Sequence, residues 1–392
     1  MLELESVDSL LNVDLAAARP LGAYMHVPFC FHKCHYCDFY SIVDSRDRQG
    51  VFTDRLIAEL QSAAGLLPSD VETIFVGGGT PTLLAVEHWR RLLQEIHSSL
   101  IRSRAVELTV EANPETITPE LASTLAQGGV NRVSIGAQSF NPIQLKTLER
   151  WHDPKNVSRA MAHFRDAGIT SINLDLIFAV PGQSLDDWLH DLDAALSLDP
   201  AHISCYGLTY EPNTPLTKKM QMGAVTRVDD TLEAQMYVAT MDRLADAGYE
   251  HYEISAWAQP GRRCAHNLIY WTNSNWWPFG PSASGHINGT RWKNVPRLGE
   301  YLDYGPLPRI QDVERLDEDG RIGEELMLGL RLIEGIELTR LERLLRAGAR
   351  ATTRREAIER FARDGLLERT ADRLRFTRDG LLLADTVLEE LI

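Results

Sequence analysis

Three cysteines, Cys30, Cys34 and Cys37, are spaced C-x3-C-x2-C in a chain of 392 residues that has five cysteines in total. They follow directly after the apolar run Gly22–Val27, which has the composition of a buried strand. Three thiolates on one short loop can hold three corners of an iron-sulfur cube. The fourth iron then has no protein ligand, and its open coordination position is what a small molecule needs in order to bind the metal. The spacing therefore predicts a [4Fe-4S] cluster on this loop.

The same loop leaves a zinc site open as an alternative. It contains His32 and His35, and a zinc ion held by three cysteines and one histidine is common. Zinc sites usually pair two ligand groups that are separated in the sequence, whereas these cysteines lie on one turn at the carboxyl end of a strand. The position of the loop favours the cluster.

Glycines and polar residues follow several other apolar runs. After one of them comes Gly77-Gly78-Gly79-Thr80-Pro81, and glycines let the backbone approach a ligand amine closely and offer it free carbonyls. Asp175 lies inside the apolar run Ser171–Phe178, where a carboxylate without a partner would be costly to bury. The alternatives are a plain turn for the glycines and a structural salt bridge for Asp175 and Glu111. Further candidates are Gln138, which follows the fourth expected strand, and Arg150, which is expected on the next helix.

The elements that must position these residues form an alternating pattern between residues 20 and 210, which predicts βα units and a parallel sheet. The expected strands are Gly22–Val27, Thr73–Val76, Val106–Glu111, Arg132–Ile135, Ser171–Phe178 and His202–Leu208. The expected outer helices, with apolar residues three and four positions apart, are Val51–Leu67, His88–Leu100, Pro119–Gln127, Asn156–Ala167 and Leu185–Leu198. Six units predict an incomplete α/β barrel, (β/α)6, with its chemistry at the carboxyl ends of the strands. Cys205, on the sixth strand, is expected to point into the barrel.

The rest of the chain is predicted to form three further parts. Residues 1–19 are an N-terminal extension before a barrel at 20–228. Residues 229–320 begin with an amphipathic helix, are dense in aromatic residues and are expected to form a linker or lid. Residues 321–392 form an α+β region whose helices and final hairpin resemble a small winged-helix unit, with Thr339 and Glu342 at capping-box spacing. Both signs of charge interleave there, so packing or a homodimer contact is favoured over DNA binding.

Composition sets limits on function. The net charge of -15 argues against a surface that binds nucleic acid, because such affinity rests on lysines and arginines that neutralise phosphates. The first twenty residues lack the cationic start and apolar run of a signal peptide, and five cysteines are too few for a disulfide scaffold. We therefore expect a cytoplasmic protein that reaches a membrane, if at all, through a partner.

The cysteine spacing after a first barrel strand resembles the motif of the radical S-adenosylmethionine (SAM) superfamily. In that superfamily the open iron of a [4Fe-4S] cluster chelates the amine and carboxylate of SAM, and one electron cleaves the carbon–sulfur bond of SAM. The resemblance implies that the cluster and SAM are the cofactors.

A longer pattern narrows the resemblance. Tyr24-x-His26-x-Pro28-Phe29-Cys30, the glycine run, Glu111-Ala-Asn-Pro114, Arg132-Val-Ser-Ile-Gly-Ala-Gln-Ser139 and Asp175-Leu-Ile are similar to the oxygen-independent coproporphyrinogen III oxidase family. The resemblance covers roughly residues 20 to 390. It implies SAM contacts at Tyr24, Gly78, Gly79, Thr80, Glu111, Gln138, Arg150 and Asp175.

Two departures separate this sequence from the true oxidases. Phe39 stands where the oxidases have a fourth cysteine, and about twenty residues precede the first strand, where the oxidases have a longer extension. Both departures, and the motif His266-Asn267-Leu-Ile-Tyr270-Trp271, resemble the heme-chaperone (HemW) branch of the family.

In that branch the motif is associated with binding heme for delivery to respiratory or other hemoproteins, membrane-bound ones included. The resemblance implies a heme site at His266, Asn267, Tyr270 and Trp271, in which a neutral imidazole is an axial ligand of the iron and flat rings form an apolar wall. Two alternatives stay open: decarboxylation of coproporphyrinogen III, and a lid in which His266 and Asn267 form only internal hydrogen bonds. Cys264, two residues before the motif, is expected to be simply buried.

Overall fold

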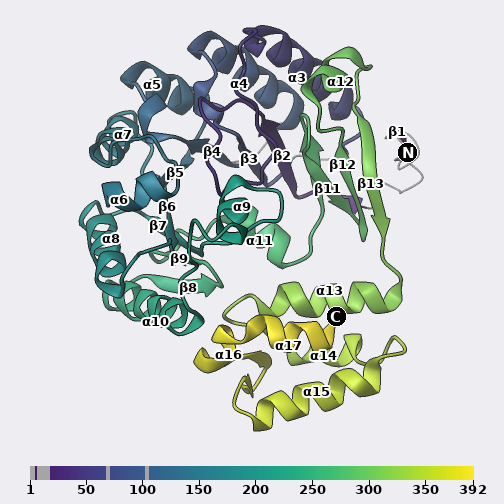
Figure 1. Ribbon diagram of the computed structural model, residues 1–392. Helices are drawn as coiled ribbons and strands as arrows, with labels where there is room; N and C mark the ends of the chain where they lie inside the picture. The colour runs from purple at the N-terminus through teal and green to yellow at the C-terminus, as the bar shows by residue number, and fades with distance from the viewer. Residues whose placement is uncertain (1–4, 7–17, 68–70, 102–105) are drawn as a thin grey trace.

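The computed structural model describes residues 5–6, 18–67, 71–101 and 106–392. Within them one sheet of thirteen strands runs through the larger part of the molecule, in the order β1-β13-β12-β11-β10-β2-β3-β4-β5-β6-β7-β9-β8. Figure 1 shows the sheet as a curved wall with helices along its outer side. The sheet does not close, because its two edge strands, β1 and β8, are not neighbours. The prediction of an incomplete α/β barrel is confirmed.

The centre of the sheet consists of the six predicted strands, all parallel. They are β2 (Gly22–Val27), β3 (Thr73–Gly78), β4 (Glu107–Ala112), β5 (Arg132–Gln138), β6 (Ser171–Phe178) and β7 (His202–Gly207). Most residues on both faces of these strands are buried, so the sequence shows apolar runs instead of strict alternation. The predicted bounds agree with the observed ones within two residues, except at the end of β5, which continues three residues further, to Gln138.

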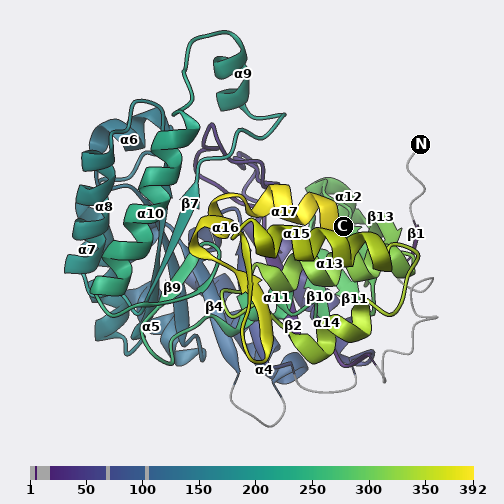
Figure 2. The same cartoon turned by 90° about the horizontal axis from the view of Figure 1, so that it is seen from below.

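Helices cover the outer face of the parallel strands, as Figure 1 shows. Those predicted are α3 (Gln49–Ala64), α4 (Val86–Leu100), α5 (Pro119–Gln127), α7 (Lys155–Asp166), α8 (Leu185–Ser197) and α10 (Asp230–Asp246). The short helices α6 (Pro142–Thr147), α9 (Pro215–Gln221), α11 (Ala265–Trp271) and α12 (Leu298–Asp303) were not predicted, because six or seven residues show too little periodicity. Figure 2 shows α9 standing clear of the body of the molecule.

Residues 250–315 extend the sheet at both edges. On one side β9 (Ala256–Ala258) pairs with β7, and β8 (Glu250–Glu253) pairs with β9. On the other side β10 (Trp276–Phe279) lies parallel to β2 and leads to three antiparallel strands. These are β11 (Ser284–Ile287), β12 (Thr290–Asn294) and β13 (Arg309–Arg315), the last paired with β1 (Glu5–Ser6). Residues 229–320 therefore share the sheet of the barrel, and the domain boundaries at 228 and 320 stay predictions.

The end of the chain has its own apolar core and matches the winged-helix expectation. A small sheet, β14-β16-β15, packs with helices that include α13 and α15. The elements are α13 (Glu318–Leu330), β14 (Ile336–Glu337), α14 (Leu338–Leu344), α15 (Ala351–Arg363), β15 (Leu367–Arg369), β16 (Arg373–Phe376), α16 (Arg378–Leu382) and α17 (Ala384–Leu391). The predicted capping box is wrong: α14 begins after Glu337 without a side-chain cap, and Glu342 pairs with Arg355 at 3.0 Å.

The prediction that Cys205 points into the barrel is wrong. Side chains alternate between the two faces of a strand, and on β7 the residues that line the barrel cavity are His202, Ser204 and Tyr206. Cys205 therefore faces the other way, into the core between sheet and helices, where it is 1% exposed. Among the described residues, no helix combines the length and apolarity needed to cross a membrane.

Candidate functional site

The cysteine loop follows the carboxyl end of β2 and is tied back by backbone hydrogen bonds. Cys30 N–H donates to Ile42 O at 2.9 Å, and Ile42 N–H donates to Pro28 O at 2.8 Å. Cys34 is buried, Cys30 and Cys37 are half-buried, and all three thiols line one cavity of about 560 Å³. The structure therefore brings the three predicted cluster ligands to one cavity.

The chemistry of these thiols fits a metal cluster. Burial raises the pKa of Cys30 and raises the pKa of Cys37 to about 11, so without metal both are protonated at neutral pH. A metal that displaces those protons gains thiolate ligands. A compensating positive charge is in place, because Arg150 Nη1 lies 3.7 Å from Cys34 Sγ.

The loop histidines do not join the thiols. His32 stacks on Trp151 with ring centroids 4.4 Å apart, and His35 Nδ1 lies 3.6 Å from a carboxylate oxygen of Glu149. In the part of the chain that the structure describes, no three His, Cys, Asp or Glu side chains gather as ligands of a single metal ion. The zinc alternative therefore gains no support.

The glycine run at the end of β3 is fixed by space and by backbone conformation. Gly78 has φ +111°, and a Cβ there would lie 2.7 Å from the His26 ring. A Cβ on Gly79 would lie 2.6 Å from Phe29 O. Only glycine fits at either position, and the next residue, Thr80, reaches Cys30 with its hydroxyl 3.6 Å from the sulfur. The run thus packs directly against the cysteine loop.

Two carboxylates face a second cavity, of about 440 Å³, inside the barrel. Glu111 accepts a hydrogen bond from Gly78 N–H at 3.0 Å, and burial together with the nearby charge of Asp175 raises the pKa of Glu111 to about 8. Burial also raises the pKa of Asp175, opposed by hydrogen bonds from Ser134 and Asn173 at 2.7 and 2.8 Å. The two cavities share lining residues: Tyr36, Cys37, Gly78, Gly79, Thr80, Asn113 and Arg150.

Gly136, which has no side chain, leaves room for Gln138 and Arg150. The prediction that Arg150 lies on a helix is wrong, because Arg150 lies in the segment between α6 and α7. A Cβ on Gly136 would lie 2.8 Å from Gln138 Nε2 and 2.9 Å from Arg150 Nη2, so glycine makes room for both. Arg150 Nη2 donates to Gly136 O at 3.1 Å, while Arg150 Nε is buried without a partner. Both residues line the barrel cavity.

The structure places Tyr24 differently from the other predicted SAM residues. Its hydroxyl lies 3.2 Å from His26 Nδ1, its ring stacks on Phe75, and it is not among the residues that line either cavity. The predicted contact of Tyr24 with SAM therefore stays untested.

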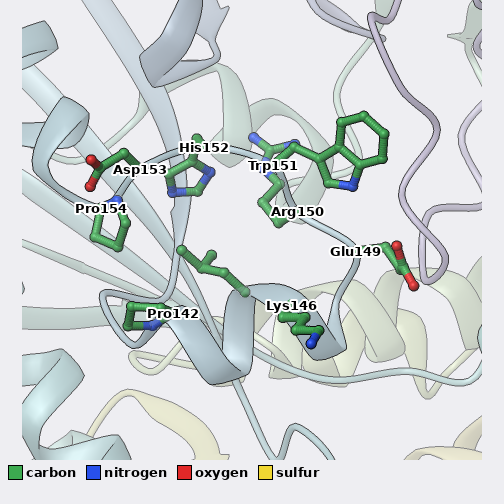
Figure 3. A pocket seen from close by; sticks show the side chains of 9 residues that line it. Pro142, Lys146, Glu149, Arg150, Trp151, His152, Asp153 and Pro154 are labelled. Carbon is green, nitrogen blue, oxygen red and sulfur yellow. The ribbon is translucent and has the colours of Figure 1, made fainter.

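A smaller pocket of about 300 Å³ lies between α6 and the segment that follows it. Figure 3 shows Lys146 on the helix and Glu149, Arg150, Trp151 and His152 on the segment. Burial and the charge of Arg150 lower the pKa of His152 to about 3, so this ring is neutral. The segment separates the small pocket from the cluster cavity, because both are lined by residues 149–153.

The motif helix α11 lies at the opposite end of the barrel, against the first residues of the strands. Glu107, which begins β4, accepts hydrogen bonds from the N–H groups of Ala265 and His266, both at 3.0 Å. Thr73 begins β3, and its hydroxyl lies 2.8 Å from His266 Nδ1. We call α11 the plug helix, because its Asn267, together with Cys264 just before the helix, lines the barrel cavity from this end.

His266 is buried, and both of its ring nitrogens have hydrogen-bond partners. It is 1% exposed, and its second ring nitrogen, Nε2, lies 2.8 Å from the Tyr270 hydroxyl. Burial lowers the pKa of His266 to about 3, so the ring is neutral, as an axial ligand must be. Neither nitrogen is free, however, so the geometry is that of the internal hydrogen-bonding alternative. Trp271 is half-buried beneath the guanidinium of Arg331, 5.9 Å from its ring centre.

Sequence reasoning missed a set of buried polar residues under Asp175. Asn173, His202, Ser204 and Tyr252 are each at most 3% exposed and are linked by hydrogen bonds. A signal was present, because polar residues recur at every second position of two predicted strands: Asn173 and Asp175, then His202 and Ser204. Such spacing places them on one face of the sheet.

Comparison with known proteins agrees with this geometry. The family model for the radical SAM superfamily matches residues 24–195, and the model for the HemN C-terminal domain matches residues 316–383. The heme chaperone HemW of Mycobacterium tuberculosis H37Rv is 39% identical over 381 residues, covering 95% of each chain. HemW of Escherichia coli K12 is 34% identical over 382 residues, covering 94% of this chain and 97% of its own. The solved structure of the E. coli coproporphyrinogen III oxidase HemN has a TM-score of 0.84 at 21% identity, covering 97% and 93% of the two chains, and shows the same fold.

Proposed function

The chain belongs to the HemW heme-chaperone family within the radical SAM superfamily, and we propose that it binds heme and delivers it to hemoproteins. The observation that carries the proposal is the gathering of the three thiols, the glycine run, Glu111 and Asp175 around two cavities that share lining residues, in a chain so similar to heme chaperones.

At the cofactor end of the barrel, different residues would bind the cluster and the different parts of SAM. Cys30, Cys34 and Cys37 would hold a [4Fe-4S] cluster, and Arg150 offsets its negative charge. The carbonyls of Gly78 and Gly79 and the carboxylate of Glu111 would accept hydrogen bonds from the amine of SAM, and Asp175 would accept them from a sugar hydroxyl. A cluster with bound SAM supplies one-electron chemistry.

Heme binding through the motif requires the plug helix to change. We propose that His266 becomes an axial ligand when the Tyr270 hydroxyl leaves Nε2, while Asn267 and Trp271 flank the macrocycle. His266 would then exchange a hydrogen bond with the Tyr270 hydroxyl for a bond to the heme iron. In the closed structure, burial already keeps the ring neutral. Recipient hemoproteins are proposed as the partners.

The second candidate function is oxidative decarboxylation of coproporphyrinogen III, which the shared HemN fold favours. Phe39 opposes it. This side chain is 63% exposed and lines the barrel cavity at the position where the oxidases have a fourth cysteine.

One experiment separates the two functions. Anaerobically reconstituted protein is loaded with heme, mixed with an apo-hemoprotein and followed by absorption, while a parallel sample receives coproporphyrinogen III, SAM and a reductant. We expect heme to move to the acceptor and no protoporphyrinogen to accumulate. Product over many turnovers, with no heme transfer, would replace the chaperone by the oxidase.

A further inference from the structure

A series of hydrogen bonds crosses the barrel from the plug helix to the carboxylate proposed for SAM. Cys264 N–H, just before the plug helix, donates to the Tyr252 hydroxyl at 3.3 Å. That hydroxyl lies 2.8 Å from His202 Nε2, and His202 Nδ1 lies 2.6 Å from Asn173 Oδ1. The Asn173 amide then reaches Asp175 Oδ1 at 2.8 Å. We call Tyr252, His202 and Asn173 the floor network.

The donors of the floor network all point the same way. The Asn173 amide nitrogen donates to Ser134 Oγ and to Asp175, at 2.7 and 2.8 Å, so its oxygen must accept from His202. His202 therefore carries its proton on Nδ1, and Nε2 accepts from the Tyr252 hydroxyl. Burial and the nearby charge of Arg132 lower the pKa of His202, which keeps a single proton on the ring. None of these side chains can rotate without breaking a hydrogen bond to the next residue of the network.

The floor network ends at the Asp175 carboxylate, which can accept further hydrogen bonds. Both oxygens of Asp175 are held from below, by Ser134 and by Asn173, while Asp175 itself is half-buried and lines the cavity. A carboxylate has about four acceptor sites, so lone pairs are left for a ligand hydroxyl. The floor network thereby fixes the direction in which these lone pairs point.

The other end of the network is anchored to the plug helix and to the C-terminal unit. Tyr252 O accepts from Ile333 N–H at 3.1 Å, and Glu107 holds the first turn of the plug helix. We propose that Tyr252 and His202 are positioning residues that act through Asn173 on Asp175, so that the placement of the plug helix sets the affinity for SAM. This inference rests on the proposed function, in which Asp175 binds SAM.

The test is a set of anaerobic SAM titrations, followed by calorimetry and by the EPR spectrum of the reduced cluster. Tyr252→Phe removes one hydroxyl and keeps the ring packing. Since one neutral hydrogen bond is worth about 1 kcal/mol, we expect roughly a fivefold rise in the Kd for SAM with unchanged iron content. The matched control is Tyr249→Phe, because this buried tyrosine donates to Pro200 O outside the network. The control should leave the Kd unchanged.

A double-mutant cycle tests the route of the effect. In an Asp175→Asn background, Tyr252→Phe should add nothing, because the residue through which it acts is already altered. His202→Leu should weaken SAM binding more than His202→Asn, since an asparagine amide can replace the Nδ1 donor. If Tyr252→Phe behaves like Tyr249→Phe, or weakens binding equally in the Asp175→Asn background, the inference is wrong. A wild-type protein that shows no response to SAM would instead overturn the proposed SAM site.

Discussion

The proposed ligand-binding side chains at the two ends of the barrel differ in whether their polar atoms already have hydrogen-bond partners. At the cluster end Arg150 keeps a buried nitrogen without a partner, and Glu111 and Asp175 face a cavity. At the plug end both nitrogens of His266 and both nitrogens of His202 are already paired. A buried polar group without a partner is costly, so the cluster end is built to be completed by ligands. His266 at the plug end has no free ring nitrogen, so it must lose a hydrogen-bond partner before it can bind a ligand.

The largest effect should come from the cluster end. Replacing Cys34, the most buried of the three thiols, by alanine removes one of three ligands that the cluster cannot replace. We expect complete loss of the roughly four irons per chain and of the brown thiolate-to-iron absorption after anaerobic reconstitution. Cys264→Ala is the control and should retain both, because Cys264 is at the plug end. Stoichiometric zinc without iron in the wild type would contradict the cluster.

Removing a charge next to the proposed SAM site should have the next largest effect. Asp175→Asn weakens a hydrogen bond to a charged group, which is commonly worth about 1.5–3 kcal/mol, so the Kd for SAM should rise by about 10- to 150-fold. Glu111→Gln should act in the same direction. Asp191→Asn is a matched control, because that carboxylate binds Ser139 and Phe140 and lines neither cavity. An EPR spectrum that saturating SAM leaves unchanged in the wild type would refute the open iron.

A smaller effect is expected on stability without cofactors. The pKa of Glu111 is raised from its ordinary 4.5 to about 8, so the native state holds a proton that the unfolded state releases. Stability from this group is present below about pH 4.5 and is lost as pH rises towards 8. The Glu111→Gln side chain cannot ionise. The melting temperature of this variant should therefore rise relative to that of the wild type as the pH increases from 5 to 8. A difference that is constant across this range would show that Glu111 is ionised in the native state.

The smallest effect should be at the plug. Tyr270→Phe frees His266 Nε2 from its hydroxyl partner, and losing one neutral hydrogen bond corresponds to about a fivefold change in an equilibrium. If release of Nε2 precedes heme binding, this variant should bind heme more tightly with an unaltered Soret band. Weaker binding would mean that Tyr270 supports heme in some other way.

The sequence predicted the centre of the sheet and the cluster ligands because both depend on local signals. Parallel strands are apolar runs, and the three cysteines lie within eight residues. It did not predict that residues 250–315 extend the sheet at both edges, since pairing such as Trp276 with Gly22 is set by contacts far apart in the chain. Nor did it reveal that Thr73 and Tyr270 close His266, because Thr73 lies 193 residues away from it.

The most direct test of the division between the two ends compares heme spectra of two variants. Heme is added anaerobically to the wild type, to Cys34→Ala and to His266→Ala, and the Soret band and affinity are recorded. We predict that Cys34→Ala loses the cluster but keeps the wild-type Soret band, whereas His266→Ala shifts the band and binds more weakly. The affinity need not vanish, because a porphyrin buries a large apolar face. A wild-type spectrum in His266→Ala, together with loss of the heme band in Cys34→Ala, would place heme at the cluster end and contradict this account.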